Sequence, residues 1–280
     1  MQRWCSAPFD PCYAGSMSRI DHASALEKQA QDGNEGTPPV LAATVILLRD
    51  RPDLRDGPDS YGRPDGAPGG SSPSVLEILM LKRNSKIAFG GMWVFPGGRL
   101  DPEDWKGVDE GDELGASRRA AEREALEECG LAVDPAAMHP FSHWTPPKTT
   151  PRRFLTWFFA ARAGAGEVEI DHGEIHESDW MSPIDALRRR DAGEIEIAPP
   201  TFVSLAELTA FRDVDHALSS IQRRKPERFQ TVIGLSDHGP VAMWHGDAGY
   251  DSGDPTAAAP HHRLTMKKKA PWLYTRTAKP

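Results

Sequence analysis

The first third of the chain alternates between short apolar stretches and long polar segments. Residues 40–48 are rich in Val, Ile and Leu and are bounded by prolines and charges, which predicts a buried strand. Residues 75–81 form a second strand candidate. The intervening residues 51–74 are dense in Gly, Pro, Asp and Ser and are expected to form a long mobile loop. Because the entropy of loop closure grows only slowly with length, we expect the two strands to pair across this loop.

Helix starts later in the chain are marked by capping residues. Ser182 and Pro183 offer an N-cap and a first helical residue for a helix that reaches residue 190. Thr201 follows two prolines and is expected to start a helix to about residue 211, and Asp213 is the expected N-cap of a third helix, to residue 222. Strands are expected at residues 154–160, 231–235, 241–245, 263–266 and 272–275, the last two as a hairpin.

This mixture of strands and helices predicts a mixed α/β or α+β fold. Residues 1–37 are polar and aperiodic, so we expect a disordered N-terminal segment. Residues 38–222 are expected to form the main domain, and residues 223–280 a C-terminal β-rich extension.

The most informative element is a helix predicted for residues 116–129, a segment rich in strong helix formers. At 100° per residue, Glu124, Glu127 and Glu128 fall within an arc of about 100° on one helix face. Arg123 precedes Glu127 by four positions and can help to orient its carboxylate. The helix therefore presents three carboxylates and one guanidinium on one side.

Three carboxylates on one face repel one another, so a fold gains little from them without a counter-charge. Hard divalent ions such as Mg²⁺ or Mn²⁺ supply that charge, because they take oxygen ligands and retain waters and substrate phosphates. Taken alone, the helix is more often a solvated surface helix rich in Glu and Arg. The glycine motif upstream of the helix shifts this balance toward a metal site.

The stretch FPGG at residues 95–98 follows the hydrophobic residues 92–94, so a strand end is predicted to run into a tight glycine turn. Glycines there let the backbone approach a ligand or the helix closely. Together with REALEECGL at residues 123–131, this stretch resembles the Nudix box, G-x5-E-x7-R-E-U-x-E-E-x-G-U with U apolar. Gly98 stands at the opening glycine, and residues 123–131 match the whole second half.

The middle of the box departs from the family pattern. Arg123 follows Gly98 by 25 positions, whereas the family pattern has fourteen, so the chain carries an insertion within residues 105–115. Asp104, a shorter acid, stands where a glutamate is usual. The insertion is acidic and contains glycine, and we expect it to lie in solvent.

Interrupted boxes of this kind resemble a branch of the family that includes coenzyme A diphosphohydrolases. Residues 81–98 partly match a coenzyme A signature, L-L-T-x-R-x4-R-x3-G-x3-F-P-G-G. Gly91 fits the signature, but its two arginines fall on Lys82 and Ile87.

The resemblance to the Nudix family implies an α/β/α sandwich with a mixed β-sheet between helices. It implies hydrolysis of a diphosphate linkage in a small nucleotide-like substrate, in which coenzyme A or an acyl-CoA is one option. Glu124, Glu127 and Glu128 would hold Mg²⁺ or Mn²⁺ as the cofactor. Glu124 or Glu177 would take the proton from the attacking water, and Arg123 would complete the catalytic group. The expected substrate-binding residues are Gly97, Gly98, Arg152 and Arg153.

Several flanking residues have two interpretations. Arg152 and Arg153 stand at the start of an apolar strand and could grip phosphate, or could be surface arginines. Trp144 could stack on a base, but packing in the core is favoured. Glu174 and Glu177 lie where Nudix enzymes often carry an extra glutamate, although a solvated loop acid is the more common role.

The overall composition limits the classes of binding partner and the cell compartment that we expect. The chain has 39% hydrophobic and 26% charged residues and a formal charge of −8, which argues against general nucleic-acid binding. Its longest apolar run is far shorter than the roughly 20 residues of a membrane helix. Three scattered cysteines without metal-ligand spacing indicate a reducing, cytoplasmic location. A homodimer is one option for the assembly state.

Two other functions stay open. One is a Nudix-fold binding or regulatory module without turnover, whose usual sign would be the loss of box carboxylates. The other is a diphosphohydrolase for nucleotide sugars or dinucleotides.

Overall fold

The computed structural model describes residues 38–52, 74–84, 90–267 and 271–277, together with Ser24, Glu27 and Lys28. The predictions of a disordered segment at residues 1–37 and a mobile loop at residues 51–74 therefore fall almost entirely outside the described residues, as does Ile87.

The first two predicted strands are confirmed, and both are longer than predicted. β1 (Val40–Pro52) pairs antiparallel with β2 (Ser74–Arg83), with Leu48 opposite Ile78. β1 also pairs in parallel with β6 (Phe154–Arg162), so the sheet is mixed. The strand order is β3-β2-β1-β6-β5-β8, with β4 added to β1 and β7 added to β2. The remaining strands of this sheet are β3 (Trp93–Val94), β4 (Gly97–Arg99), β5 (His139–Thr145), β7 (Ile175–Met181) and β8 (Glu227–Gln230).

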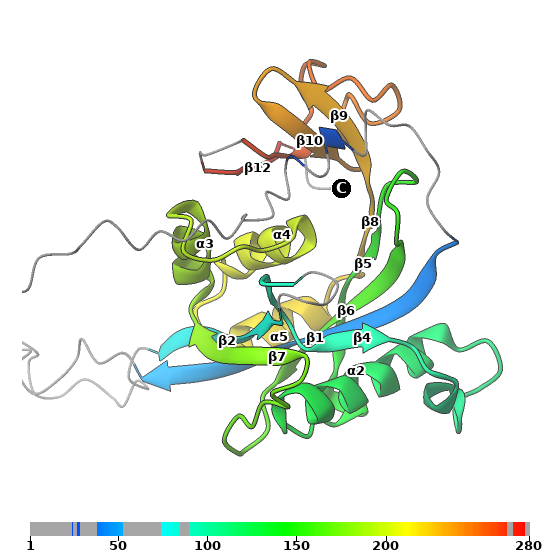
Figure 1. The fold of residues 1–280 in the computed structure, drawn as a ribbon, viewed down its shortest axis with the longest axis vertical. Helices are drawn as coiled ribbons and strands as arrows, with labels where there is room; N and C mark the ends of the chain where they lie inside the picture. The colour runs from blue at the N-terminus through cyan, green and yellow to red at the C-terminus, as the bar shows by residue number, and fades with distance from the viewer. Residues whose placement is uncertain are drawn as a thin grey trace, which may run out of the picture.

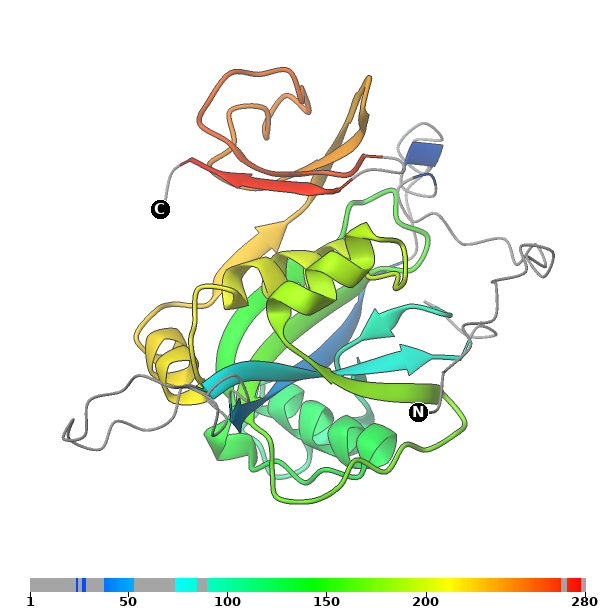
Figure 2. The same ribbon diagram turned by 90° about the vertical axis from the view of Figure 1, so that its left-hand side faces the viewer.

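Helices cover both faces of the sheet, as the predicted sandwich requires (Figures 1 and 2). α2 (Glu113–Cys129) packs on one face through its alanines, against a cluster that includes Val45, Leu79 and Leu81. The other face, with Ile46, Ile78 and Met80, is covered by three helices. These are α3 (Pro183–Asp191), α4 (Pro199–Leu208) and α5 (Val214–Gln222).

The predicted caps are confirmed at α3 and α5. The side chain of Ser182 accepts a hydrogen bond from the backbone amide of Asp185, and that of Asp213 accepts one from His216. α4 begins at Pro199, two residues before the predicted start at Thr201. Prolines are tolerated in the first turn, because the amides there have no partner within the helix.

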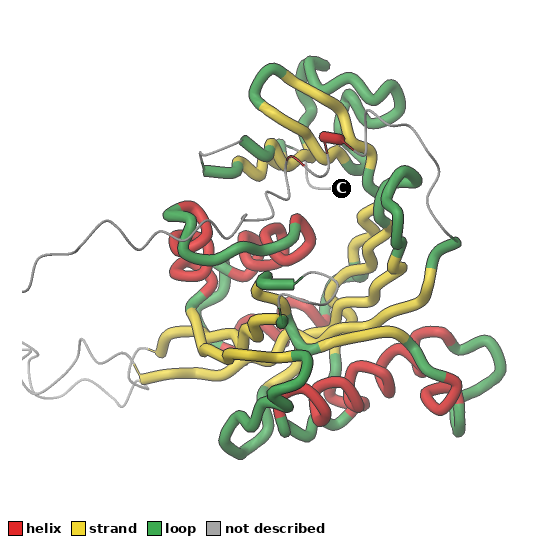
Figure 3. Tube along the Cα trace, viewed as in Figure 1, coloured by secondary structure: helices red, strands yellow, loops and turns green. Residues whose placement is uncertain are grey.

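A second, antiparallel sheet lies beyond α3 and α4 (Figure 3). Its order is β12-β11-β10-β9, and the predicted hairpin is confirmed, with Leu264 opposite Tyr274. Its Trp244 and Trp272 belong to the same apolar cluster as Ile46, so the two sheets share one core. The strands are β9 (Val232–Ser236), β10 (Gly239–Met243), β11 (His262–Thr265) and β12 (Leu273–Arg276).

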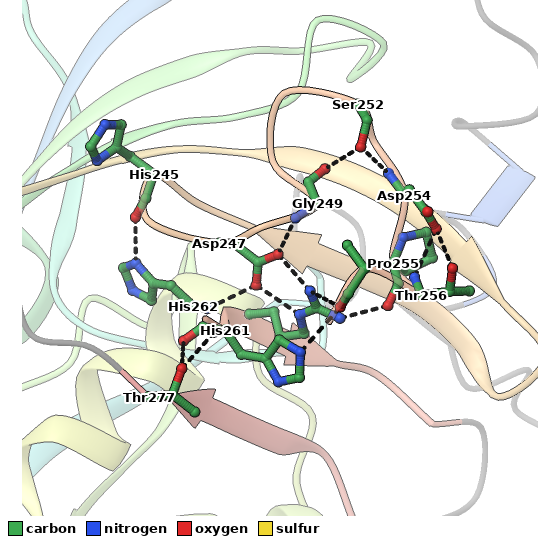
Figure 4. A network of polar contacts seen from close by, with 12 residues as sticks. His245, Asp247, Gly249, Ser252, Asp254, Pro255, Thr256, His261, His262 and Thr277 are labelled. Atoms are coloured by element: carbon green, nitrogen blue, oxygen red, sulfur yellow. Dashed lines mark hydrogen bonds and ion pairs between the residues drawn. The ribbon is translucent and has the colours of Figure 1, made fainter. Parts of the chain in front are cut away.

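A buried ion pair fixes the long loop between β10 and β11 (Figure 4). The guanidinium of Arg263 donates to both carboxylate oxygens of Asp247, at 2.7 Å from Nε and 2.6 Å from Nη2, and its Nη1 and Nη2 also donate to backbone carbonyls of the same loop. These bonds hold the pKa of Asp247 below its ordinary value although burial acts the other way. This ion pair therefore has a structural role.

Among the described residues, no helix is long and apolar enough to cross a membrane.

Candidate functional site

α2 carries the three predicted glutamates, and its ends are fixed by local signals. The side chain of Asp112 caps the first turn by accepting from the amide of Gly115, and Gly130 ends the helix in the left-handed conformation, at φ 71°. Ala121 and Ala125 are fully buried against the sheet. Small side chains bring the helix close to the strands, so the glutamates at its edge meet the backbone of β4.

The glycine pair lies in a strand, not in the tight turn that the sequence suggested. Gly97 and Gly98 pair with Thr44 and Ala43 of β1. A Cβ on Gly97 would lie 2.5 Å from the carbonyl oxygen of Ala43, and a Cβ on Gly98 would lie 2.2 Å from Oε1 of Glu124. The predicted close approach to the helix is therefore observed, and it explains why glycine occupies both positions.

Glu128 is the most buried of the three glutamates, with 4% of its surface exposed. Its Oε2 accepts a hydrogen bond of 2.9 Å from the amide of Gly97. Its Oε1 is buried and has no hydrogen-bond partner among the described residues. Burial raises the pKa of Glu128 to about 8, which the Gly97 amide only partly offsets. An ionised carboxylate here needs a cation.

Arg123 braces the other two glutamates. Its Nη1 lies 2.8 Å from Oε1 of Glu124 and 3.2 Å from Oε2 of Glu127. Burial raises the pKa of Glu124 against the influence of this arginine, whereas the Glu127 side chain is 60% exposed. The predicted orienting role of Arg123 thus extends from Glu127 to Glu124.

Asp104 holds Arg123 from the other side. Its buried carboxylate accepts from Nε and Nη2 of Arg123 and from the backbone amide of Asp101. The bond to Asp104 is the main cause of the raised pKa of Arg123. Asp104 lies in a short 3-10 helix, η2 (Pro102–Trp105), which brings the shorter acid to the arginine.

The insertion after η2 is largely exposed. Asp109, Glu110 and Asp112 face solvent, as expected. Glu113 differs, because it already belongs to α2 and accepts a hydrogen bond of 3.0 Å from Nε1 of Trp157.

Glu177 of β7 and Glu174, which directly precedes β7, have ion-pair partners on opposite sides of the sheet. Glu177 pairs with Lys82 on the face that carries α3, where Asp179 also pairs with Arg189. Glu174 instead contacts Arg83, and its charge acts on both Glu124 and Glu128. The structure therefore brings Glu174 and Arg83 to the site and places Glu177 away from it. Every second side chain of a strand lies on the same face of the sheet. Since Leu79 and Leu81 are buried against α2, this rule could have placed Arg83 on the α2 face from the sequence.

The other predicted residues have mixed positions. Trp144 is packed in the core, stacked on Phe229 with ring centroids 3.9 Å apart. Arg152 is exposed, and Arg153 is half-buried at the start of β6, where its carbonyl accepts from the amide of Val40. A role of these two arginines in phosphate binding stays a prediction.

The donor set suits a hard divalent ion, since it consists of carboxylates, one with an unpartnered buried oxygen. Within the described parts of the chain, no three acidic, histidine or cysteine side chains stand in the arrangement of a ready-made ion site. The reason is visible in the contacts: Glu124 and Glu127 turn toward Arg123, and Glu128 turns toward Gly97. Ion binding therefore requires these side chains to change partners.

Comparison with known proteins gives matches to a family model, to a protein sequence and to solved structures. Residues 72–201 match the sequence model of the NUDIX domain. The "Putative nudix hydrolase 7" of Caenorhabditis elegans is 27% identical over 214 residues, which cover 63% of this chain and 70% of that protein. The crystal structure of a NUDIX hydrolase from Alicyclobacillus acidocaldarius superposes with a TM-score of 0.53 at 22% identity, covering 68% of this chain and 99% of that one. At this level of identity the structural match concerns the fold alone.

Proposed function

We propose, from the match of residues 72–201 to the NUDIX domain, that the protein is a metal-dependent diphosphohydrolase of nucleoside diphosphate derivatives. The NUDIX domain and the Nudix hydrolase relative support a hydrolase that acts on pyrophosphate bonds. The observation that carries the metal dependence is the buried Glu128 carboxylate, whose Oε1 is unpartnered beside two further glutamates of the same helix.

In this proposal Glu124, Glu127 and Glu128 hold Mg²⁺ or Mn²⁺. Such an ion, when bound, lowers the pKa of a coordinated water and neutralises charge on the diphosphate. Arg123 keeps Glu124 and Glu127 in place, and Asp104 keeps Arg123 in place. The backbone of Gly97 and Gly98 leaves room beside the carboxylates.

Glu124 is the better candidate for the general base. Its pKa is raised by burial, which makes its carboxylate a stronger proton acceptor at neutral pH. Glu177 is 56% exposed and paired with Lys82 on the opposite face, so we do not assign it this role.

Coenzyme A or an acyl-CoA is the substrate favoured by the interrupted box and by Gly91. Nucleotide sugars and dinucleotides are the alternatives, since Lys82 and Ile87 occupy the arginine positions of the coenzyme A signature. Arg152 and Arg153 are the proposed phosphate ligands. The buried free thiol of Cys129 fits the reducing cytoplasm that we propose as the location.

The test is turnover of coenzyme A, a nucleotide sugar and a dinucleotide with Mg²⁺ or Mn²⁺, with a chelator as control. We expect metal-dependent release of two phosphate-bearing products from at least one substrate. A protein that binds these compounds but turns over none of them with either ion would be a binding module, and the proposal would be wrong.

A further inference from the structure

Two base–acid pairs follow each other in the ladder between β2 and β7. Lys82 lies opposite Glu177, and their side chains are joined at 2.7 Å between Nζ and Oε1. At the next position of β2, the Nη2 of Arg83 contacts the Glu174 carboxylate just before β7 begins. A shift in the ladder register occurs between Lys82 and Arg83.

The two pairs lie on opposite faces of the sheet. Leu79 and Leu81 pack with α2, and Arg83 continues this alternation. Met80 packs in the apolar cluster with α3 and α4, and Lys82, two residues later, lies on the same face as Met80. The Arg83 side chain is 17% exposed, whereas that of Lys82 is 35% exposed.

Arg83 acts electrostatically on Glu128 as well as contacting Glu174. Its charge favours the ionised form of Glu128, while the Glu174 charge disfavours it. The Nε of Arg83 is buried and has no hydrogen-bond partner among the described residues. The same holds for Oε1 of Glu128. A buried guanidinium nitrogen and a buried carboxylate oxygen thus both lack partners at one site.

We propose that Arg83 is the internal counter-ion of the box glutamates and competes with the divalent ion, so that it sets the affinity of the site for metal. Glu174 is a positioning residue in this scheme, because its carboxylate holds the guanidinium beside the glutamates without letting it pair with Glu128. The inference rests on the proposed function, since it assumes that the glutamates bind a divalent ion.

Charge balance gives the direction of the effect. A divalent ion that joins Glu124 and Glu128 meets the positive charge of Arg83 at short range, and the two cations repel each other in a partly desolvated site. Removal of the Arg83 charge should therefore strengthen ion binding. Removal of the Glu174 charge should weaken it, because a negative charge is lost and Arg83 becomes free to pair with Glu128.

The experiment measures Mn²⁺ binding to the metal-free full chain by calorimetry. We expect Arg83→Met to bind Mn²⁺ about fivefold more tightly than wild type, and Glu174→Gln about fivefold more weakly. The matched controls are Lys82→Met and Glu177→Gln, the neighbouring pair on the other face, which should stay within about twofold of wild type. Unchanged or weaker binding by Arg83→Met would overturn the inference.

A second readout separates competition from a purely structural role. Without metal, Arg83→Met should melt at a lower temperature than wild type, and Mn²⁺ should raise its melting temperature by more than it raises that of wild type. Arg83→Lys keeps the charge and should retain the wild-type Mn²⁺ affinity. If Arg83→Met does not fold, Arg83→Gln takes its place in both measurements.

The outcomes distinguish this inference from the proposed function. Wild-type protein that binds Mn²⁺ but hydrolyses no diphosphate would refute the proposed function and leave the inference standing if Arg83→Met binds more tightly. Mn²⁺-dependent hydrolysis with equal affinity in wild type and Arg83→Met would refute the inference alone. Wild-type protein that binds no Mn²⁺ would refute both.

Discussion

Both oxygens of the Asp104 carboxylate accept hydrogen bonds from the Arg123 guanidinium, at 3.2 Å from Nε and 3.0 Å from Nη2. The same arginine contacts Glu124 and Glu127, so one buried aspartate controls the geometry of two glutamates.

Asp104→Asn should lower both stability and turnover. Its amide can accept at one oxygen only, so Arg123 loses a charged partner at a cost of about 1–3 kcal/mol. At roughly 2–4 °C per kcal/mol, the melting temperature should fall by several degrees, with about a tenfold loss of turnover. Asp109→Asn, in the exposed insertion, is the control and should change neither. Wild-type turnover in Asp104→Asn would show that Arg123 needs no support from Asp104.

Gly98→Ala and Gly97→Ala should differ in what they damage. The added Cβ at residue 98 would meet the Glu124 carboxylate, a side chain that can move, so turnover should fall by about tenfold or more while the fold survives. The Cβ at residue 97 would meet the backbone of β1, so the melting temperature should fall first. Thermal melts and turnover on both variants check this contrast, which fails if Gly98→Ala is the less stable protein.

Glu128→Gln and Glu127→Gln should each cut turnover by about a hundredfold, because each removes one charge from the proposed ion site. Their stability effects should differ in metal-free protein. Glu128 is buried with a pKa raised from 4.5 to about 8, so wild type loses stability as the pH rises between these values, and the neutral replacement should raise the melting temperature increasingly over this range and by the full amount above it. Glu127 is 60% exposed, and its replacement should leave stability nearly unchanged. Near wild-type turnover of either variant at saturating Mg²⁺ would argue against the metal site.

His262 should make stability depend on pH. Its Nδ1 lies 3.0 Å from the carbonyl oxygen of His245 and its Nε2 lies 3.2 Å from the Tyr274 hydroxyl, which fits a neutral ring. Burial is the main cause that lowers its pKa below the ordinary 6.5. The unfolded chain therefore takes up a proton first as the pH falls, and the stabilisation present above about pH 6.5 is lost below it.

Melting temperatures measured between about pH 7 and pH 5 check this sign. The decrease should be smaller in His262→Gln than in wild type. His238→Gln, in the exposed turn between β9 and β10, should follow wild type. Parallel curves for wild type and His262→Gln would exclude the contribution.

Local signals in the sequence were sufficient for the elements that local physics determines. The caps at Ser182 and Asp213, the individual strands β1 and β2 and the carboxylate face of α2 all follow from neighbours within a few positions. The comparisons and the structure confirm the fold class that these elements predicted.

The features that were missed depend on distant partners. Glycine has a low propensity for strands, so the sequence did not indicate β4. The two glycines are nevertheless in a strand, because β1 and α2 leave no room for a Cβ at these positions. Glu174 reaches the site through its contact with Arg83, which lies beyond a register shift after Lys82, and the sequence reveals neither that contact nor the shift. β8 pairs in parallel with β5 in the large sheet, although it lies beyond the predicted domain end at residue 222. That domain boundary stays a prediction.

The shared core bears on the order in which the protein can be made. When the ribosome has released residues 1–222, every box carboxylate has been synthesised, but Phe229, Trp244 and Trp272 have not. Those side chains bury the cluster that contains Ile46 and Ile78. Until they emerge, a nascent chain with a complete acidic helix leaves exposed the part of this apolar cluster that α3, α4 and α5 do not cover, which is the kind of surface that chaperones bind. The core of the site-bearing sandwich is therefore complete only after synthesis has passed residue 272, well after the last box carboxylate.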